Sequence, residues 1–269
     1  MLSIIIFSGC PNEFVSIGGE MLDFKRPVIA AHRGFSAQYP ENTMASFEAA
    51  VQAGAQMIEL DVTLSRDEEV VVIHDSTVDR TTNGTGPVNR LMLRELKALD
   101  AGGWFHVRFS EERIPLLSEV MDAFVDRVLI NIEIKNGEEL SCFAPGVLEK
   151  KVYALIRDRR ATHRVLVSSF HAGMLSRIVR FSKKVPVALL EENGDTGKMF
   201  SLCSKLKVFS LHPQFEMVNA DMVARCHEAG IFVFAWNVLS EKDVEACLHM
   251  DVDGLIVDDP LMAMARITD

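Results

Sequence analysis

The stretch that decides the fold is Met57–Leu64, which reads MIELDVTL and is apolar apart from two carboxylates and a threonine. After residue 26, short runs of this kind alternate with segments in which apolar residues recur at helical spacing. That alternation is typical of βα units and a parallel sheet. Eight runs are predicted strands, namely Val28–Ala31, Met57–Leu64, Val128–Ile134, Val165–Ser168, Val185–Leu189, Val208–Leu211, Phe232–Ala235 and Gly254–Val257.

The segments between and after these strands are predicted helices, at Met44–Ala53, Leu117–Phe124, Gly146–Arg159, Ala172–Phe181, Gly197–Ser204, Ala220–Ala229, Glu241–Met250 and Leu261–Arg266. Gly54 and Gly230 stand where helices end, and Asn219 and Ser240 where helices begin, which are the residue types that caps require. Eight strands with eight helices predict a single (β/α)8 TIM barrel. An open doubly wound sheet is disfavoured, because its glycine-rich GxGxxG turn is absent from the sequence.

The predicted barrel domain comprises residues 27–269, and residues 1–26 are an N-terminal extension of uncertain role. Residues 75–115 carry polar turns and one short predicted helix near Leu91–Leu99. A connection of about 40 residues is far longer than a usual βα loop, so we predict a small insertion after the second strand. Loops in that position lie over the C-terminal mouth of a barrel, so the insertion is a candidate lid that sets specificity.

Composition and charge narrow the class of protein. With 48% hydrophobic and 25% charged residues, the chain can bury a core without disulfides, and its five cysteines form no CxxC pattern. The formal net charge of -10 argues against binding of nucleic acid. No segment approaches the ~20 apolar residues of a membrane span, so we expect a cytoplasmic enzyme without integral membrane association. Export as a lipoprotein through Cys10 is the less favoured alternative, because the preceding apolar run is short and lacks a charged flank.

Three carboxylates are predicted to converge at the barrel mouth. Glu59 and Asp61, at i and i+2 of one strand, project from the same face, where two buried negative charges repel unless a cation or proton lies between them. Glu133 on the third strand completes an oxygen-rich site that suits Mg²⁺ or Ca²⁺ better than zinc. We therefore predict one divalent cation, either Mg²⁺ or Ca²⁺. The alternative is a structural salt bridge from Lys135 to Glu133 or Asp61.

Two histidines reach the same mouth. His32 ends the first strand, and His74 follows the apolar run Val71–Ile73, which favours a general acid and general base pair. Arg33 offers a planar fork for phosphate oxygens, and Lys135 offers a point charge. Together these groups suit phosphoryl transfer at a diester, with one histidine accepting a proton while the other protonates the leaving alcohol.

Other polar and aromatic residues near the mouth have less certain roles. Glu41 is expected to reach the metal or Arg33, or to be structural, and Asn42 is expected to cap the first helix. Further candidates for substrate contact at predicted strand ends are Phe35, Ser168, Phe170, His171 and His212.

The ordered motifs of the chain resemble those of the glycerophosphodiester phosphodiesterase family over roughly residues 27 to 260. These motifs are His32-Arg33-Gly34, Pro40-Glu41-Asn42-Thr43, Glu59-Leu60-Asp61, His74-Asp75, Asp79-Arg80-Thr81-Thr82-Asn83-Gly84-Thr85-Gly86 and Glu133-Ile134-Lys135. The resemblance implies hydrolysis of a small-molecule glycerophosphodiester to glycerol 3-phosphate and an alcohol, directly or through a cyclic phosphate. It implies His32 and His74 as the catalytic pair, metal ligands at Glu59, Asp61 and Glu133, and phosphate contacts from Arg33 and Lys135.

Two departures from the family pattern lie near the C-terminus. The seventh strand reads Trp236-Asn237-Val238-Leu239 where the family usually has Trp-Thr-Val-Asn, and Val257-Asp258 stands where Thr-Asp is usual. The resemblance implies that Trp236 forms one wall of the glycerol or alcohol pocket, so these departures bear on substrate preference.

Two alternative functions remain open from the sequence. One is a phospholipase-type phosphodiesterase acting on lysophospholipid or intact lipid, which needs an apolar rim facing the membrane. The other is a non-catalytic phosphate-binding module, which would be expected to have lost a histidine or a carboxylate. The sequence leaves the released alcohol and the oligomeric state open.

Overall fold

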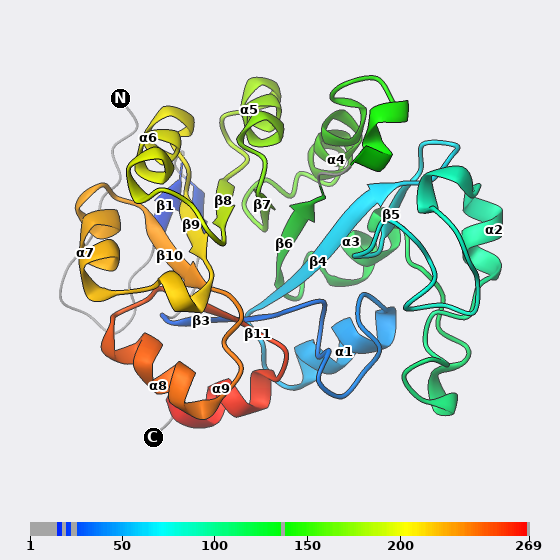
Figure 1. Cartoon of the computed structure of the whole chain (residues 1–269), viewed down its shortest axis with the longest axis horizontal. Coiled ribbons are helices and arrows are strands. Elements are labelled where there is room, and N and C mark those ends of the chain that lie inside the picture. Colours follow the sequence, from blue (N-terminus) through cyan, green and yellow to red (C-terminus); the bar gives the residue numbers. More distant parts are fainter. Residues whose placement is uncertain (1–14, 18–19, 23–25, 136–137, 268–269) are drawn as a thin grey trace.

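The computed structural model describes residues 15–17, 20–22, 26–135 and 138–267, and its centre is a closed barrel of parallel strands (Figure 1). The barrel strands are β3 (Val28–Ala31), β4 (Met57–Leu64), β6 (Leu129–Ile134), β7 (Val165–Ser169), β8 (Val187–Glu191), β9 (Ser210–Pro213), β10 (Phe232–Ala235) and β11 (Gly254–Val257). Neighbouring strands pair in parallel around the ring, and β3 closes it by pairing with both β11 and β4. The predicted (β/α)8 TIM barrel is confirmed.

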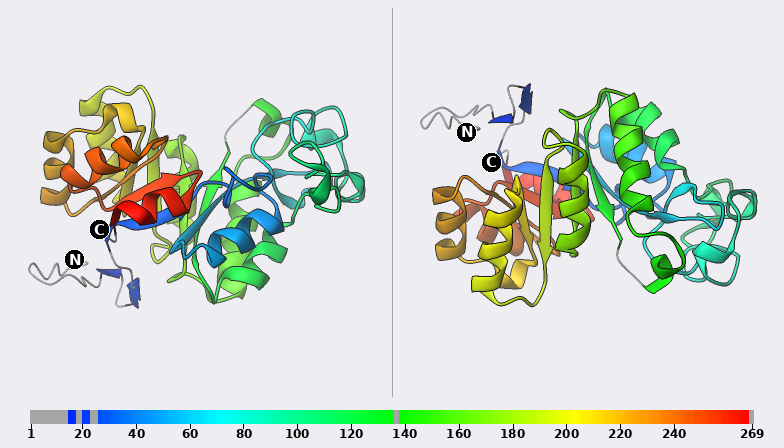
Figure 2. Two further views of the ribbon diagram at one scale, coloured as in Figure 1. Left: turned by 90° about the horizontal axis from the view of Figure 1, so that it is seen from below. Right: turned by 90° about the horizontal axis from the view of Figure 1, so that it is seen from above.

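Helices surround the barrel on its outer side (Figures 1 and 2). They are α1 (Met44–Gln52), α3 (Leu117–Phe124), α4 (Val147–Asp158), α5 (Ala172–Phe181), α6 (Thr196–Leu206), α7 (Ala220–Glu228), α8 (Glu241–His249) and α9 (Pro260–Ile267). The predicted caps at Asn219 and Ser240 are confirmed, because both side chains accept a hydrogen bond from a backbone N–H of the first turn. The prediction that Asn42 caps α1 is wrong. Thr43 is the cap, and Asn42, with φ 57°, turns its side chain to Asp61.

Two strands begin two residues later than predicted. The expected runs at 185–189 and 208–211 correspond to Val187–Glu191 and Ser210–Pro213. Val185 and Val208 are buried, but both precede the first residue of the strand. An apolar run indicates burial, whereas a strand begins where the backbone starts to pair. Before β8, Pro186 has no N–H to donate to such a pairing.

The chain leaves β4 through a hairpin rather than through a direct βα connection. Strand β5 (Val70–Val72), which was not predicted, pairs antiparallel with β4 in the register Val62 to Val72. The segment that follows contains η1 (Val88–Arg90), α2 (Leu93–Ala98) and η2 (Val107–Phe109), and lies to one side of the barrel (Figure 2). It has a hydrophobic cluster of its own, formed by Val71, Ile73, Val78, Val88, Leu96, Ala101 and Ile114. The hairpin returns the chain to the barrel mouth at His74.

The remaining described elements are η3 (Glu138–Cys142), η4 (Phe215–Met217) and the short hairpin β1 (Val15–Ile17) and β2 (Glu20–Leu22). The suggested lipidation at Cys10 lies outside the described residues. The boundary at residue 26 and the cytoplasmic location stay predictions. Within the described ranges, no helix combines the length and apolar character needed to cross a bilayer.

In β4 and β6, the side chains inside the barrel change from apolar to polar along the strand. Inward residues of β4 run from Met57 to Glu59 and Asp61, and those of β6 run from Leu129 to Asn131 and Glu133, because alternate residues share a face. The lower layer is apolar and includes Phe232, Phe234 and Ile256 with Met57 and Leu129. The polar groups therefore stand on a packed hydrophobic floor at the C-terminal mouth, where enzymes with this fold place their active sites.

Candidate active site

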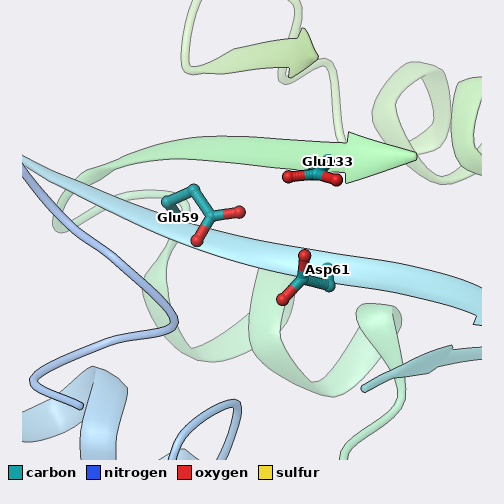
Figure 3. Close-up of side chains that lie close together, drawn as sticks. All are labelled: Glu59, Asp61 and Glu133. Atoms are coloured by element: carbon teal, nitrogen blue, oxygen red, sulfur yellow. The ribbon is translucent and has the colours of Figure 1, made fainter. Parts of the chain in front are cut away.

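Strands β4 and β6 bring three carboxylates together. Asp61 lies opposite Glu133 in the strand register, and Glu59 lies two residues before Asp61. One oxygen from each side chain lies within 4.8 Å of the other two, and the three residues are only 2%, 1% and 9% exposed. Figure 3 shows the three carboxyl groups on the two neighbouring strands. This buried acidic triad can bind a metal ion through hard oxygen ligands.

The three carboxyl groups of the triad differ in how readily they ionise. Burial and the charge of Asp61 raise the pKa of Glu59 to about 8, and the same two causes raise the pKa of Glu133. Burial acts in the same direction on Asp61, but the charges of Lys135 and Arg33 outweigh it and lower its pKa to about 2. Burial and mutual repulsion therefore disfavour the ionised forms of Glu59 and Glu133 unless further positive charge is bound.

Lys135 forms the ion pairs that the sequence analysis offered as an alternative to metal binding. Its Nζ donates to Glu133 Oε1 at 2.8 Å and lies 3.4 Å from Asp61 Oδ1. These contacts leave Glu59 Oε1 and Asp61 Oδ1 buried without a hydrogen bond within the described residues. Buried oxygens of this kind are costly unless a further partner binds them, so the lysine accounts for only part of the cluster.

Each of the two predicted histidines is held by a carboxylate through Nδ1. His32 Nδ1 donates to Asp258 Oδ1 at 2.7 Å, and His74 Nδ1 donates to Asp75 Oδ1 at 2.6 Å. Donation from Nδ1 leaves Nε2 available to exchange protons, and both histidines line the cavity at the mouth. Burial acts to lower the pKa of His32, but the hydrogen bond with Asp258 and the charge of Glu59 outweigh it and raise that pKa.

Sequence reasoning missed Asp258 as a site residue. It directly follows β11, lines the cavity, and also accepts a hydrogen bond from Ser36 Oγ at 3.0 Å. Its position after the last barrel strand was the available signal, because residues there lie at the mouth. The sequence alone did not indicate which histidine it would meet.

Arg33 is held in place by acidic groups on both sides. Its backbone N–H donates to Glu59 Oε2 at 2.9 Å, and its Nη1 donates to Glu41 Oε1 at 2.9 Å. Its Nε lies 3.4 Å from Asp61 Oδ2. The expected contact between Glu41 and Arg33 is therefore present.

Asn42 also belongs to the site. Its Nδ2 donates to Asp61 Oδ2 at 2.8 Å, and its Oδ1 accepts from the backbone N–H of Asp61 at 3.3 Å. This residue therefore fixes the orientation of one of the three carboxylates.

A cavity of about 390 Å³ opens above the triad. Its lining includes the two histidines, Arg33 and Lys135, together with an apolar group formed by Phe170, Leu190, Trp236, Val238 and Leu239. The predicted wall residue Trp236 donates its Nε1–H to the His212 carbonyl at 3.0 Å and packs edge-on against Phe170, with ring centroids 5.8 Å apart. Phe170 thus lines the cavity as expected, but Phe35, Ser168, His171 and His212 do not line it.

A closed barrel whose mouth holds two histidines, three buried carboxyl groups, Arg33 and Lys135 suits a barrel hydrolase of phosphate esters. Residues 32–262 match the model of the Glycerophosphoryl diester phosphodiesterase family, and the chain belongs to that family. The enzyme is accordingly a phosphoric diester hydrolase, and the alternative of a non-catalytic module is wrong.

Several relatives share most of their length with this chain. A glycerophosphodiester phosphodiesterase of Caldanaerobacter subterraneus subsp. tengcongensis is 40% identical over 236 residues, which cover 87% of this chain and 95% of the relative. Another of the same name from Bacillus altitudinis is 36% identical, with 86% and 94% covered. A solved phosphodiesterase of Oleispira antarctica, in complex with the product sn-glycerol-3-phosphate, superposes with a TM-score of 0.82 at 27% identity, covering 91% of this chain and 98% of that structure.

Proposed function

We propose that this enzyme hydrolyses glycerophosphodiesters to glycerol 3-phosphate and an alcohol, with a divalent cation and two histidines. The observation that carries the proposal is the pair His32 and His74, each oriented by a carboxylate at the rim of a cavity above an acidic triad. The product bound to the Oleispira antarctica relative supports a glycerol phosphate moiety as part of the substrate.

The triad fits Mg²⁺ or Ca²⁺. Its donors are carboxylate oxygens, and two of them, Glu59 Oε1 and Asp61 Oδ1, accept no hydrogen bond within the described residues. When bound, the cation supplies positive charge that offsets the anionic diester and acidifies the attacking hydroxyl. We assign Glu59, Asp61 and Glu133 as its ligands.

The histidines move the protons. One accepts a proton at Nε2 from the attacking water or glycerol hydroxyl, and the other donates a proton from Nε2 to the leaving alcohol oxygen. Asp258 and Asp75 keep each ring in the tautomer with a proton on Nδ1, because an ionised carboxylate accepts but cannot donate. Arg33 and Lys135 lie beside the triad and bind the non-bridging oxygens of the phosphate.

The apolar side of the cavity receives the rest of the substrate. Trp236 and Phe170, packed edge-on against each other, form an apolar wall that can pack against the carbon atoms of the glycerol or the alcohol. This wall lies in the same cavity as the cationic groups, so the cavity offers a substrate both apolar and charged surfaces.

A lysophospholipid is the second candidate substrate, on one specific observation. Phe170 and Leu239 line the cavity and remain 41% and 64% exposed, an apolar edge beside the mouth. An acyl chain leaving the cavity would cover this edge, whereas a small head group would leave it in water. We place the soluble glycerophosphodiester first, because the edge consists of few residues.

The proposal is tested with purified protein on glycerophosphocholine, glycerophosphoethanolamine and lysophosphatidylcholine, each with Mg²⁺, with Ca²⁺ or with a chelator. Glycerol 3-phosphate is read with a coupled dehydrogenase, and choline release is read for the lysolipid. We expect activity on the two water-soluble diesters that disappears with chelator and in His32→Ala. Turnover of the lysolipid alone would select the second candidate, and activity that survives the chelator would refute the metal requirement.

A further inference from the structure

Arg80 makes an unusually complete set of contacts for a residue at the surface. It follows β5 and belongs to the inserted segment rather than to the barrel. Its Nε and Nη2 donate to the two oxygens of Asp75 at 2.7 and 3.0 Å. Its Nη1 and Nη2 donate to the two oxygens of Glu41 at 2.7 and 2.8 Å. One guanidinium thus binds two carboxylates, each in a bidentate manner.

Both carboxylates hold a residue of the proposed reaction. Asp75 accepts the Nδ1–H of His74 at 2.6 Å, and Glu41 accepts from Arg33 Nη1 at 2.9 Å. Arg80 therefore contacts His74, the proposed proton-transfer group, through Asp75. It contacts Arg33, the proposed phosphate-binding group, through Glu41. Among the hydrogen bonds of the described residues, Arg80 provides the only side chain that binds both Asp75 and Glu41.

A single exposed ion pair contributes little to stability. The Arg80 side chain is 44% exposed, so its contacts are partly screened. However, the planar fork fixes direction as well as distance, which a lysine at the same place could not do. The hydrogen bond from Arg80 is also the largest cause that lowers the pKa of Asp75, so Asp75 stays ionised as the acceptor for His74.

We propose that Arg80 is a positioning residue of this enzyme, which orients His74 through Asp75 and Arg33 through Glu41. This inference rests on the proposed function, because it assigns His74 and Arg33 their roles in diester hydrolysis. It also gives the insertion a role in catalysis, because the insertion supplies the guanidinium group that orients both His74 and Arg33. The competing explanation is that Arg80 only ties the insertion to the barrel.

The test compares Arg80→Ala and Arg80→Lys with Arg90→Ala, which removes an exposed arginine of the same insertion. We expect Arg80→Ala to lower kcat/KM for glycerophosphocholine about 100-fold, the size of effect that a misplacement of about 1 Å causes. Arg80→Lys should recover little of the loss, because an ammonium cannot bind both carboxylates in a bidentate manner. Equal activity of Arg80→Ala and Arg90→Ala would overturn the proposal.

A double-mutant cycle separates positioning from mere structural support. Arg80→Ala is combined with His74→Ala, and residual activity is followed on bis(p-nitrophenyl) phosphate, whose leaving group needs little protonation. If Arg80 acts through His74 and Arg33, the fold-loss of activity caused by Arg80→Ala is clearly smaller in the His74→Ala background than in the wild type. Fully additive losses, together with a lower melting temperature, would assign Arg80 a structural role instead.

A readout without turnover keeps this inference separate from the proposed function. Long-range ¹⁵N–¹H spectra of the full chain report the tautomer of each histidine, and His74→Gln identifies the signal of His74. We expect the Nδ1-protonated form in the wild type and in Arg90→Ala, and a mixture of tautomers in Arg80→Ala. An unchanged His74 signal in Arg80→Ala would overturn the inference, even if the wild type hydrolysed every diester tested. An inactive wild type with the expected spectral change would instead count against the proposed substrate.

Discussion

His32 Nδ1 and Asp258 Oδ1 lie 2.7 Å apart although 226 residues separate them in the chain. His32 directly follows β3 and Asp258 directly follows β11, and these two strands pair where the barrel closes. Closure of the barrel therefore creates one of the two carboxylate–histidine pairs. The other pair, His74 with Asp75, is formed by adjacent residues and needs no closure.

Asp258→Asn is expected to lower kcat on the order of 10²- to 10⁴-fold, the range in which acid–base catalysis contributes. The amide can donate as well as accept, so it no longer requires the proton of His32 to stay on Nδ1. The measurement is kcat for glycerophosphocholine beside Asp221→Asn, which alters an exposed aspartate of α7. A kcat within threefold of wild type in Asp258→Asn would show that the pair does not orient His32.

Glu59→Gln is expected to have opposite effects on the metal-free and metal-loaded protein. Burial raises the pKa of Glu59 to about 8, so ionisation of this residue works against folding when no cation is bound. The amide removes that cost, and the melting temperature in chelator should rise. The increase in melting temperature on adding Mg²⁺ or Ca²⁺ should shrink or vanish, because one ligand is lost.

The control for this prediction is Glu111→Gln, at an exposed position of the insertion. It should behave as wild type with chelator and with the cation. An unchanged metal-induced stabilisation in Glu59→Gln would remove this residue from the ligand set.

The barrel was predictable from the sequence because its signal is local. Runs such as Met57–Leu64 have the length and apolar character of buried strands, and the helices between them keep a helical period. The triad was predictable for the same reason, because i and i+2 on one strand must share a face. Strand β5 was missed because three residues give too little pattern to distinguish a strand from a loop.

Several partners of the site residues were not predictable, because they depend on tertiary proximity. Asp258 meets His32 only through barrel closure, and Arg80 meets Glu41 across 39 residues. Asn42 matched the residue type of a helix cap, but its contact with Asp61 prevailed and Thr43 took the cap. Local propensity cannot decide between possible partners of a polar side chain, because the contacts that favour one partner form only in the folded protein.

His227 is expected to make stability depend on pH at the opposite end of the barrel. Its Nε2 lies 2.9 Å from Oδ2 of the buried Asp253, and the hydrogen bond with Asp253 is the main cause that raises the pKa of His227. Because the folded pKa is raised, the pair stabilises the protein fully below about pH 6.5, and this contribution is lost as pH rises through the folded value.

The measurement is the free energy of unfolding by urea between pH 5 and 8.5 for the wild type and His227→Gln. The difference between the two proteins should be largest at low pH and should shrink as the pH rises, while kcat stays unchanged. A difference that grows with pH would show that the pair is not charge-assisted.

Trp236→Ala is expected to raise KM for glycerophosphocholine, with a loss of about 10-fold in kcat/KM and little change in kcat. The hydrogen bond from the ring to the His212 carbonyl and its edge contact with Phe170 hold it as a fixed apolar wall. Such a wall binds the substrate and the transition state equally, which is the condition under which a mutation raises KM alone.

The chain contains two tryptophans, so Trp104→Ala, in the insertion, is the matched control and should leave KM at the wild-type value. A fall in kcat as large as the rise in KM would mean that Trp236 orients the reacting atoms and does more than contact the glycerol or alcohol. In that case Trp236→Phe, which keeps a flat ring but loses the hydrogen bond to His212, would separate the contribution of the ring from that of its anchoring.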